Sequence, residues 1–413
     1  MPEKYSPSPS HNLEEDLDLD QEEMNYIGDM VEVIDDQDDD EQDEMMEEDE
    51  EAAENDDIVT EFNRHEGSVF CGSLTNDGKL AATGGEDDMA YVWDTSSGEI
   101  IHECKGHKDS LIFTEFNHDN TYLATGDMSG IINVWRMSDK ARIWDYNMGD
   151  ATWMKWHSQA NVLFAGSVDG EIYMWKIPSE ECKVFQGYGQ RTETATLTPD
   201  GKRLIAGYED GAIRVLDLKE GTVQVTIPAG LAHTAAITDL DCQIDGKLII
   251  SAAVDGKTVL STTQNGKIVS ILQDLQGNKT VNMEAGPADD ESESKDDWVE
   301  AVAFCKDPEL PLVATGTLNG EIFIWDSCKQ AIRHKITQEN GVSKLVWLGT
   351  TPFLFSAGLD GVMRYYDGRT GRCIKSLWFH TEGILDLCIS RDGKKILTTS
   401  DDSSARISDV PEC

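Results

Sequence analysis

One stretch of the chain, His65 to Asp94, recurs with variations through most of the sequence. It reads HEGSVFCGSLTNDGKLAATGGEDDMAYVWD. After a polar loop come an alternating run (Val69 to Leu74), an Asn-Asp-Gly turn, a second run (Leu80 to Thr83), a Gly/Asp turn and a third run (Ala90 to Trp93). This pattern predicts three short antiparallel strands joined by tight turns.

The position of Trp93 recurs at intervals of 40 to 45 residues, with one interval of 64. A period in the low forties, with four strands per unit, is typical of WD-repeat β-propellers. We therefore predict an all-β, eight-bladed WD-repeat propeller over residues 58–413. The long interval is explained by a polar, acidic insertion at 276–297, which we expect to form a loop between blades five and six. The equivalent positions are Trp93, Trp135, Trp175, Leu216, Ser261, Trp325, Tyr366 and Ser408.

Four polar or aromatic residues per unit predict a hydrogen-bonded network inside the blade. Buried polar groups must be satisfied, and repetition at equivalent blade positions indicates a structural rather than a catalytic role. The first unit has all four, and the others have some of them. The candidates are His65, Thr83, Asp87 and Trp93; His107, Thr125 and Trp135, with Ser129 in place of the Asp; Asp169 and Trp175; His233, Ser251 and Asp255; and His380, Thr398 and Asp402.

Residues 1–57 hold 26 of the 79 acidic residues and a single basic one, Lys4. Such a segment repels itself and lacks apolar surface, so we predict a disordered acidic tail. Met24 to Ile34 interrupts this acidic segment with apolar residues, either as a short binding motif or as part of a solvated spacer.

Ile58 to Phe62 is strand-like, and because the last unit supplies only three strands, we expect it to pair as the outer strand of blade eight.

Several functional classes are disfavoured by the sequence. It contains no nucleotide-binding, kinase, hydrolase or metalloprotease motif, so we expect no enzyme activity and no cofactor. The nine cysteines show no metal-ligand spacing, which leaves no candidate metal site. With a net charge of -45, direct nucleic-acid binding is not expected. No secretory signal or membrane span is visible, so we expect a cytoplasmic monomer, with a minor nuclear or membrane-associated fraction left open.

The loops of one face of the propeller carry mostly carboxylates. In this fold the loop leading into each blade and the turn between its second and third strands share the top face. Charges commonly populate exposed loops, but together these would attract a basic partner. The candidate partner-binding residues are Glu66, Glu86, Asp88, Asp109, Asp127, Asp150, Trp153, Glu209, Glu382 and Asp401, against only Lys108 and Arg191 as nearby cations.

Several motifs resemble the angio-associated migratory cell protein family. They are LATGDMSGIINVW (Leu123 to Trp135), WMKWH (Trp153 to His157), DGEIYMWKIP (Asp169 to Pro178), CKVFQG (Cys182 to Gly187), PDGKRLIAGYEDGAIRVLDLKEG (Pro199 to Gly221) and DGRTGR (Asp367 to Arg372). The resemblance covers essentially the whole propeller. It implies an eight-bladed ring whose fungal members are chaperones of a large-subunit ribosomal protein, holding its basic N-terminal segment on an acidic top face. Animal members are associated with cell migration and with heparin binding through a basic N-terminal stretch, which is absent here.

Two functional hypotheses follow. The first is a non-catalytic propeller that escorts a basic ribosomal large-subunit protein during ribosome assembly. The second is a signalling scaffold acting in cell migration and angiogenesis-type processes. Binding of a basic client weakens steeply with ionic strength, whereas an apolar scaffold contact does not, so salt separates the two.

Overall fold

The computed structural model describes residues 58–179, 181–276 and 298–411. The predicted tail (1–57), the motif at Met24 to Ile34, and the insertion after Gln276 lie outside the described residues. Within them, the strands form eight antiparallel four-stranded sheets.

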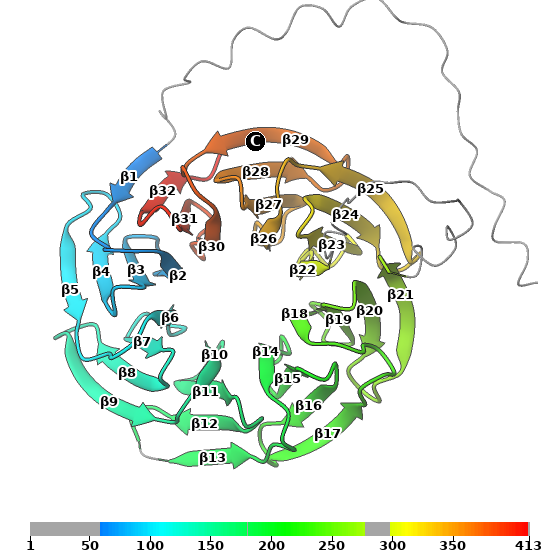
Figure 1. The fold of residues 1–413 in the computed structure, drawn as a ribbon, viewed down its shortest axis with the longest axis horizontal. Helices are drawn as coiled ribbons and strands as arrows, with labels where there is room; N and C mark the ends of the chain where they lie inside the picture. The colour runs from blue at the N-terminus through cyan, green and yellow to red at the C-terminus, as the bar shows by residue number, and fades with distance from the viewer. Residues whose placement is uncertain (1–57, 180, 277–297, 412–413) are drawn as a thin grey trace, which may run out of the picture. The chain divides into compact units, whose positions relative to one another are not determined.

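Each sheet is one blade, and its strands follow one another from the centre of the ring outward (Figure 1). The strands are β1 (Ile58–Phe62); in blade 1, β2 (Val69–Leu74), β3 (Leu80–Gly85), β4 (Ala90–Asp94) and β5 (Ile100–Cys104); in blade 2, β6 (Leu111–Phe116), β7 (Tyr122–Asp127), β8 (Ile131–Arg136) and β9 (Ala141–Asn147); in blade 3, β10 (Ala151–Trp156), β11 (Val162–Ser167), β12 (Ile172–Lys176) and β13 (Cys182–Phe185); in blade 4, β14 (Thr192–Leu197), β15 (Arg203–Tyr208), β16 (Ile213–Asp217) and β17 (Thr222–Ile227); in blade 5, β18 (Ile237–Cys242), β19 (Leu248–Ala253), β20 (Lys257–Thr262) and β21 (Ile268–Asp274); in blade 6, β22 (Val299–Phe304), β23 (Leu312–Thr317), β24 (Glu321–Asp326) and β25 (Ala331–Thr337); in blade 7, β26 (Val342–Trp347), β27 (Phe353–Gly358), β28 (Val362–Asp367) and β29 (Arg372–Trp378); and in blade 8, β30 (Ile384–Ile389), β31 (Lys395–Ser400) and β32 (Ala405–Asp409).

The second strand of each blade lies deepest in the protein. In β23 all six residues are buried, and in the other seven blades only the first residue of this strand is partly exposed. Strands buried on both faces are expected to be apolar or small throughout, as in LVATGT and LIISAA. The cores therefore lie between neighbouring blades, and the inner strands contact one another in cyclic order from β2 to β30 and back to β2. The prediction of an eight-bladed all-β propeller is confirmed.

Blade 8 is completed by a strand from the other end of the propeller. β1 pairs antiparallel with β32, with Phe62 opposite Ala405. The Phe62 side chain is 1% exposed and stacks on the indole of Trp93 in blade 1, with ring centroids 4.7 Å apart. β1 thus covers the edge of blade 8, as expected from the sequence, and it also packs on blade 1, which the sequence did not indicate.

Candidate protein-binding face

In blade 1 a histidine links the incoming loop to the turn between the second and third strands. The His65 Nε2 atom lies 3.0 Å from the Thr83 hydroxyl, which also accepts the Trp93 indole N–H at 3.2 Å. The hydroxyl therefore donates to Nε2, and the imidazole donates from Nδ1 to Asp87 at 3.0 Å. Burial opposes ionisation of Asp87, but the hydrogen bonds from His65 and two backbone N–H groups hold its pKa below the usual value.

Blade 2 builds the same network with a carboxylate from a different position. His107 contacts Asp127 at 3.1 Å through Nδ1 and Thr125 at 2.8 Å through Nε2, and Trp135 donates to Thr125 at 3.0 Å. The sequence suggested that Ser129 takes the place of the carboxylate, and this is wrong. Ser129 instead donates a 2.7 Å hydrogen bond to Asp127. Asp127 is fully buried, so its assignment to the partner-binding surface is wrong.

Blades 5 and 8 contain the network without tryptophan. His233 lies 2.7 Å from Ser251 and 3.2 Å from Asp255, and His380 lies 2.8 Å from Thr398 and 3.0 Å from Asp402. The structure does not bring the blade 3 candidates together, because Asp169 is exposed and the buried Trp175 indole N–H has no hydrogen-bond partner among the residues described.

Two further blades use other residues at the histidine position, four residues before the inner strand. In blade 4 the Tyr188 hydroxyl donates to Asp210 at 2.9 Å, and the Arg214 guanidinium lies 3.8 Å from the Tyr188 ring centroid. In blade 7 Gln338 accepts a 3.1 Å hydrogen bond from Ser356. Counting back four residues from each inner strand, rather than searching for histidine, would have found both.

These networks predict loss of stability in mild acid. Burial lowers the pKa of His107 and of His380, although Asp127 and Asp402 oppose the shift. Between these lowered values and about 6.5, the unfolded chain binds more protons than the folded one, so stability falls as pH drops through that window. The carboxyls of Asp87 and Asp402 have pKa values below the usual value, so these two groups lose their contribution to stability only below about pH 3.9.

We therefore expect the double substitution His107→Gln and His380→Gln to reduce the drop in melting temperature between about pH 7.5 and about pH 5.5. Gln338 in blade 7 shows that glutamine fits this position. Differential scanning calorimetry measures the drop in both proteins. An equal drop in the two would contradict the assignment of acid sensitivity to these imidazoles.

The same backbone hydrogen bond fixes the top of all eight blades. In each blade, the first residue after the second strand donates its N–H to the carbonyl of the residue just before the inner strand, at 2.8 to 3.2 Å. These residues therefore surround the opening of the central channel, and we call them the top ring. The top ring consists of Glu86, Met128, Val168, Glu209, Val254, Leu318, Leu359 and Asp401.

Most of the predicted acidic residues are accessible on this face. Seven are exposed and Asp88 is partly exposed; the exposed ones are Glu66, Glu86, Asp109, Asp150, Glu209, Glu382 and Asp401. Trp153 is not an exposed anchor, which corrects the sequence-based assignment. It is the third residue of β10, it is 6% exposed, and its indole lies over Gly166 within a core that includes Phe164 and Leu204.

The carboxylates of the top ring have few hydrogen bonds or ion pairs with the described part of the chain. Glu209 and Asp401 make no hydrogen bond or ion pair with the described part of the chain through their carboxylates, and Glu86 accepts only a 3.3 Å bond from the Ser68 N–H. Burial and the charge of Glu209 raise the pKa of the neighbouring Glu193, although Arg191, 3.5 Å away, opposes the shift. Negative charge is thus concentrated where a cationic segment could neutralise it.

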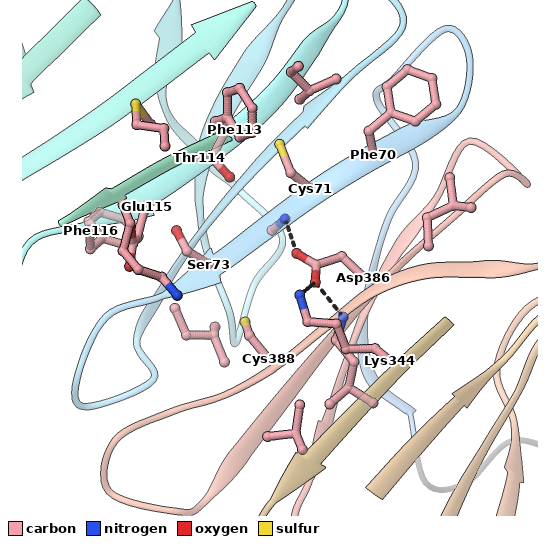
Figure 2. A pocket seen from close by; sticks show the side chains of 18 of the residues that line it. Phe70, Cys71, Ser73, Phe113, Thr114, Glu115, Phe116, Lys344, Asp386 and Cys388 are labelled. Carbon is pink, nitrogen blue, oxygen red and sulfur yellow. Dashed lines mark hydrogen bonds and ion pairs between the residues drawn. The ribbon is translucent and has the colours of Figure 1, made fainter. Parts of the chain in front are cut away.

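The wall of the central channel contains a second group of charged residues (Figure 2). A cavity of about 660 Å³ lies between the inner strands of blades 1, 2, 3, 7 and 8. Within it, Asp386 contacts the Lys344 ammonium at 2.8 Å and accepts the Gly72 N–H at 3.1 Å. The nearby Asp386 charge raises the pKa of Lys344. These groups link blades 7, 8 and 1.

Other inner-strand carboxylates join neighbouring blades at two further junctions. Glu115 accepts the Trp156 N–H at 2.8 Å, joining blades 2 and 3, and Asp239 accepts the Val302 N–H at 2.9 Å, joining blades 5 and 6. Burial raises the pKa of Asp239 to about 6. Since these carboxylates are engaged in joining blades, the channel wall serves closure of the ring, and the top ring remains the candidate binding surface.

Other kinds of site receive no support from the described residues. Across 58–179, 181–276 and 298–411, His, Cys, Asp and Glu side chains nowhere gather in groups of three or more that could hold a metal ion. The same part of the chain contains no helix long and apolar enough to cross a membrane.

Comparison with known proteins agrees with the repeat architecture. The family model "WD domain, G-beta repeat" matches residues 57–94, 98–136, 224–260 and 371–409. The human angio-associated migratory cell protein is 39% identical over 355 residues, which cover 85% of this chain and 80% of the human protein. The chain belongs to the angio-associated migratory cell protein family.

Fungal proteins are similar to this family member over the same region. The ribosome assembly protein Sqt1 of Saccharomyces cerevisiae is 24% identical over 391 residues, covering 86% of each chain. The crystal structure of Chaetomium thermophilum Sqt1, bound to the N-terminus of the ribosomal protein L10, superimposes with a TM-score of 0.73. It is 22% identical, and the match covers 86% of this chain and all of the fungal one. At this identity the similarity establishes the fold.

Proposed function

We propose that this protein binds and shields the basic terminal segment of a large-subunit ribosomal protein before that protein is assembled. The observation that carries the proposal is the exposed set of top-ring carboxylates, Glu86, Glu209 and Asp401, held on a fixed backbone frame with few opposing cations. The fungal Sqt1 structure, in which a propeller of the same fold holds the N-terminus of L10, supports the choice of client.

The chemistry required is recognition rather than catalysis. Carboxylates arranged around one opening increase the rate of encounter with a cationic segment and discriminate against acidic ones. Because the backbone frame is already formed in the free protein, little ordering entropy is lost on the propeller side. Release then needs only a competing surface of greater negative charge, such as ribosomal RNA, and no nucleotide hydrolysis.

The test is a titration of the full-length protein with a synthetic peptide of the N-terminal segment of ribosomal protein L10, measured by isothermal titration calorimetry. We expect binding that weakens by about tenfold or more when salt rises from about 50 mM to about 300 mM, because exposed charges are increasingly screened. Absence of binding at low salt, or an affinity that does not change with salt, would contradict the proposal.

A second candidate is a scaffold acting in cell migration, to which the human relative's name refers. It is favoured by apolar side chains exposed on the outer strands β25 and β29, namely Ile332 (52% exposed), Ile374 (44%) and Trp378 (58%). A partner bound there would resist salt. Substitution of Trp378 by Ser would weaken that partner and leave L10-peptide binding unchanged.

A further inference from the structure

The top ring is not uniformly acidic. Around the opening, blades 8, 1 and 4 present Asp401, Glu86 and Glu209, whereas the other five blades present apolar side chains. Three of these are large and exposed, Met128 (50%), Val168 (36%) and Val254 (37%). The remaining two, Leu318 and Leu359, are partly exposed.

The shared backbone hydrogen bond does not require apolar residues at these positions. Each of the eight makes the same backbone hydrogen bond, and the bond is equally short for Glu86 and Val254, both 2.9 Å. Turns of this kind normally carry polar residues, which are better hydrated when exposed. Because a carboxylate and a branched hydrocarbon satisfy the same backbone geometry, this hydrogen bond does not decide which blades carry acidic and which carry apolar residues.

Three of the apolar residues lie on consecutive blades, 5, 6 and 7, and end next to a carboxylate. Leu359 of blade 7 lies against two glycines, since a Cβ on Gly341 would sit 3.0 Å, and one on Gly383 3.3 Å, from its methyl carbons. The Gly383 carbonyl accepts the N–H of Asp401, the top-ring residue of blade 8. An apolar arc, Val254, Leu318 and Leu359, therefore runs directly into the acidic pair of blades 8 and 1.

We infer that the top ring binds an extended segment in which leucine-sized apolar side chains are interleaved with arginines or lysines. This inference rests on the proposed function and specifies its ligand. The carboxylates attract any cationic segment, and the apolar arc adds contacts that only a mixed segment can make. A purely cationic chain would leave Val254, Leu318 and Leu359 facing water and would forgo their burial.

The experiment compares two synthetic peptides of equal length and charge, one with arginines interleaved with leucines and one with every leucine replaced by serine. The leucine peptide should bind the full-length protein about tenfold more tightly than the serine peptide. This gain corresponds to partial burial of one or two leucine side chains. The variant Val254→Ser, Leu318→Ser, Leu359→Ser should lose this advantage and bind the serine peptide as the unmodified protein does.

A matched control carries the same number of serine substitutions at exposed apolar residues away from the top ring. Ile244, in the turn between β18 and β19, and Ile271 and Ile332, on outer strands, are 39%, 51% and 52% exposed. This control should keep the full preference for the leucine peptide.

The outcomes separate the two proposals. If neither peptide binds the unmodified protein, the proposed function fails. If both bind with equal affinity, or if the control loses the preference as fully as the top-ring variant does, the apolar arc has no role and this inference is overturned while the proposed function stands. A top-ring variant that weakens both peptides equally also overturns it.

Discussion

Simultaneous replacement of Glu86, Glu209 and Asp401 by lysine should abolish binding of the L10 peptide while the propeller stays folded. Each change turns an attraction into a repulsion at an exposed position, and juxtaposed like charges at an interface cost several kcal/mol in sum. We expect at least a hundredfold loss of affinity, about 2.7 kcal/mol. Calorimetric titration measures the affinity, and the melting temperature, which should be little changed, reports on folding.

The control changes the net charge of the protein by the same amount on the opposite face. Glu99, Glu220 and Glu309 are exposed and lie in turns at the bottom of blades 1, 4 and 6. Their replacement by lysine should reduce affinity only slightly, since only long-range charge is altered. If the two triple variants bind alike, the peptide is held elsewhere and the assignment of the top ring is incorrect.

Deletion of residues 1–63 should destabilise the propeller severely, whereas deletion of residues 1–56 should not. The longer deletion removes β1, exposes the edge of β32 and takes away Phe62, a fully buried aromatic that stacks on Trp93. Loss of a buried phenylalanine alone costs about 3–5 kcal/mol. We expect the melting temperature to fall by about 10 °C or more, measured by calorimetry.

Point substitutions in the full-length protein separate the contribution of the Phe62 side chain to stability from that of the β1 backbone. Phe62→Ala should reproduce a large part of the loss, whereas Val59→Ala, at a position 43% exposed in the same strand, should have little effect. Equal melting temperatures for the two deletions would show that β1 is dispensable for closure.

The fold was predictable because the sequence repeats one pattern of strands and turns. Eight units at a common period specify eight blades, and the missing fourth strand of the last unit leaves Ile58 to Phe62 as its only evident partner. Network residues with a fixed spacing, such as His65 and Thr83, could also be located, because the same interval of 18 residues recurs in His107–Thr125 and His380–Thr398.

The individual site residues were less predictable because burial depends on orientation, not only on position. Asp127 ends β7 where blade 1 has a glycine, and its carboxylate turns inward to meet His107. Trp153 follows a bulge in β10, at a position where other blades place Cys71 or Asp239, and the space above Gly166 accommodates its ring. Neither orientation can be derived from the period of the repeat.

The apolar members of the top ring were missed for a different reason. Carboxylates gathered in loops stand out in the sequence, whereas a valine or leucine in a single turn does not. The backbone hydrogen bond shared by the eight turns is what places Glu86 and Asp401 in one ring with apolar residues such as Leu318.

The pairing of β1 with β32 has a consequence for how the protein is made. The ion pair between Glu61 and Arg406 spans 345 residues of sequence. The first strand of the ring to be synthesised therefore cannot pair until the last strand has been made. At roughly 5–20 residues per second, this delay is about 17–70 seconds. Throughout that interval the nascent ring has an unpaired strand at its beginning, and such a strand is open to pairing with other sheet edges until β32 has been made.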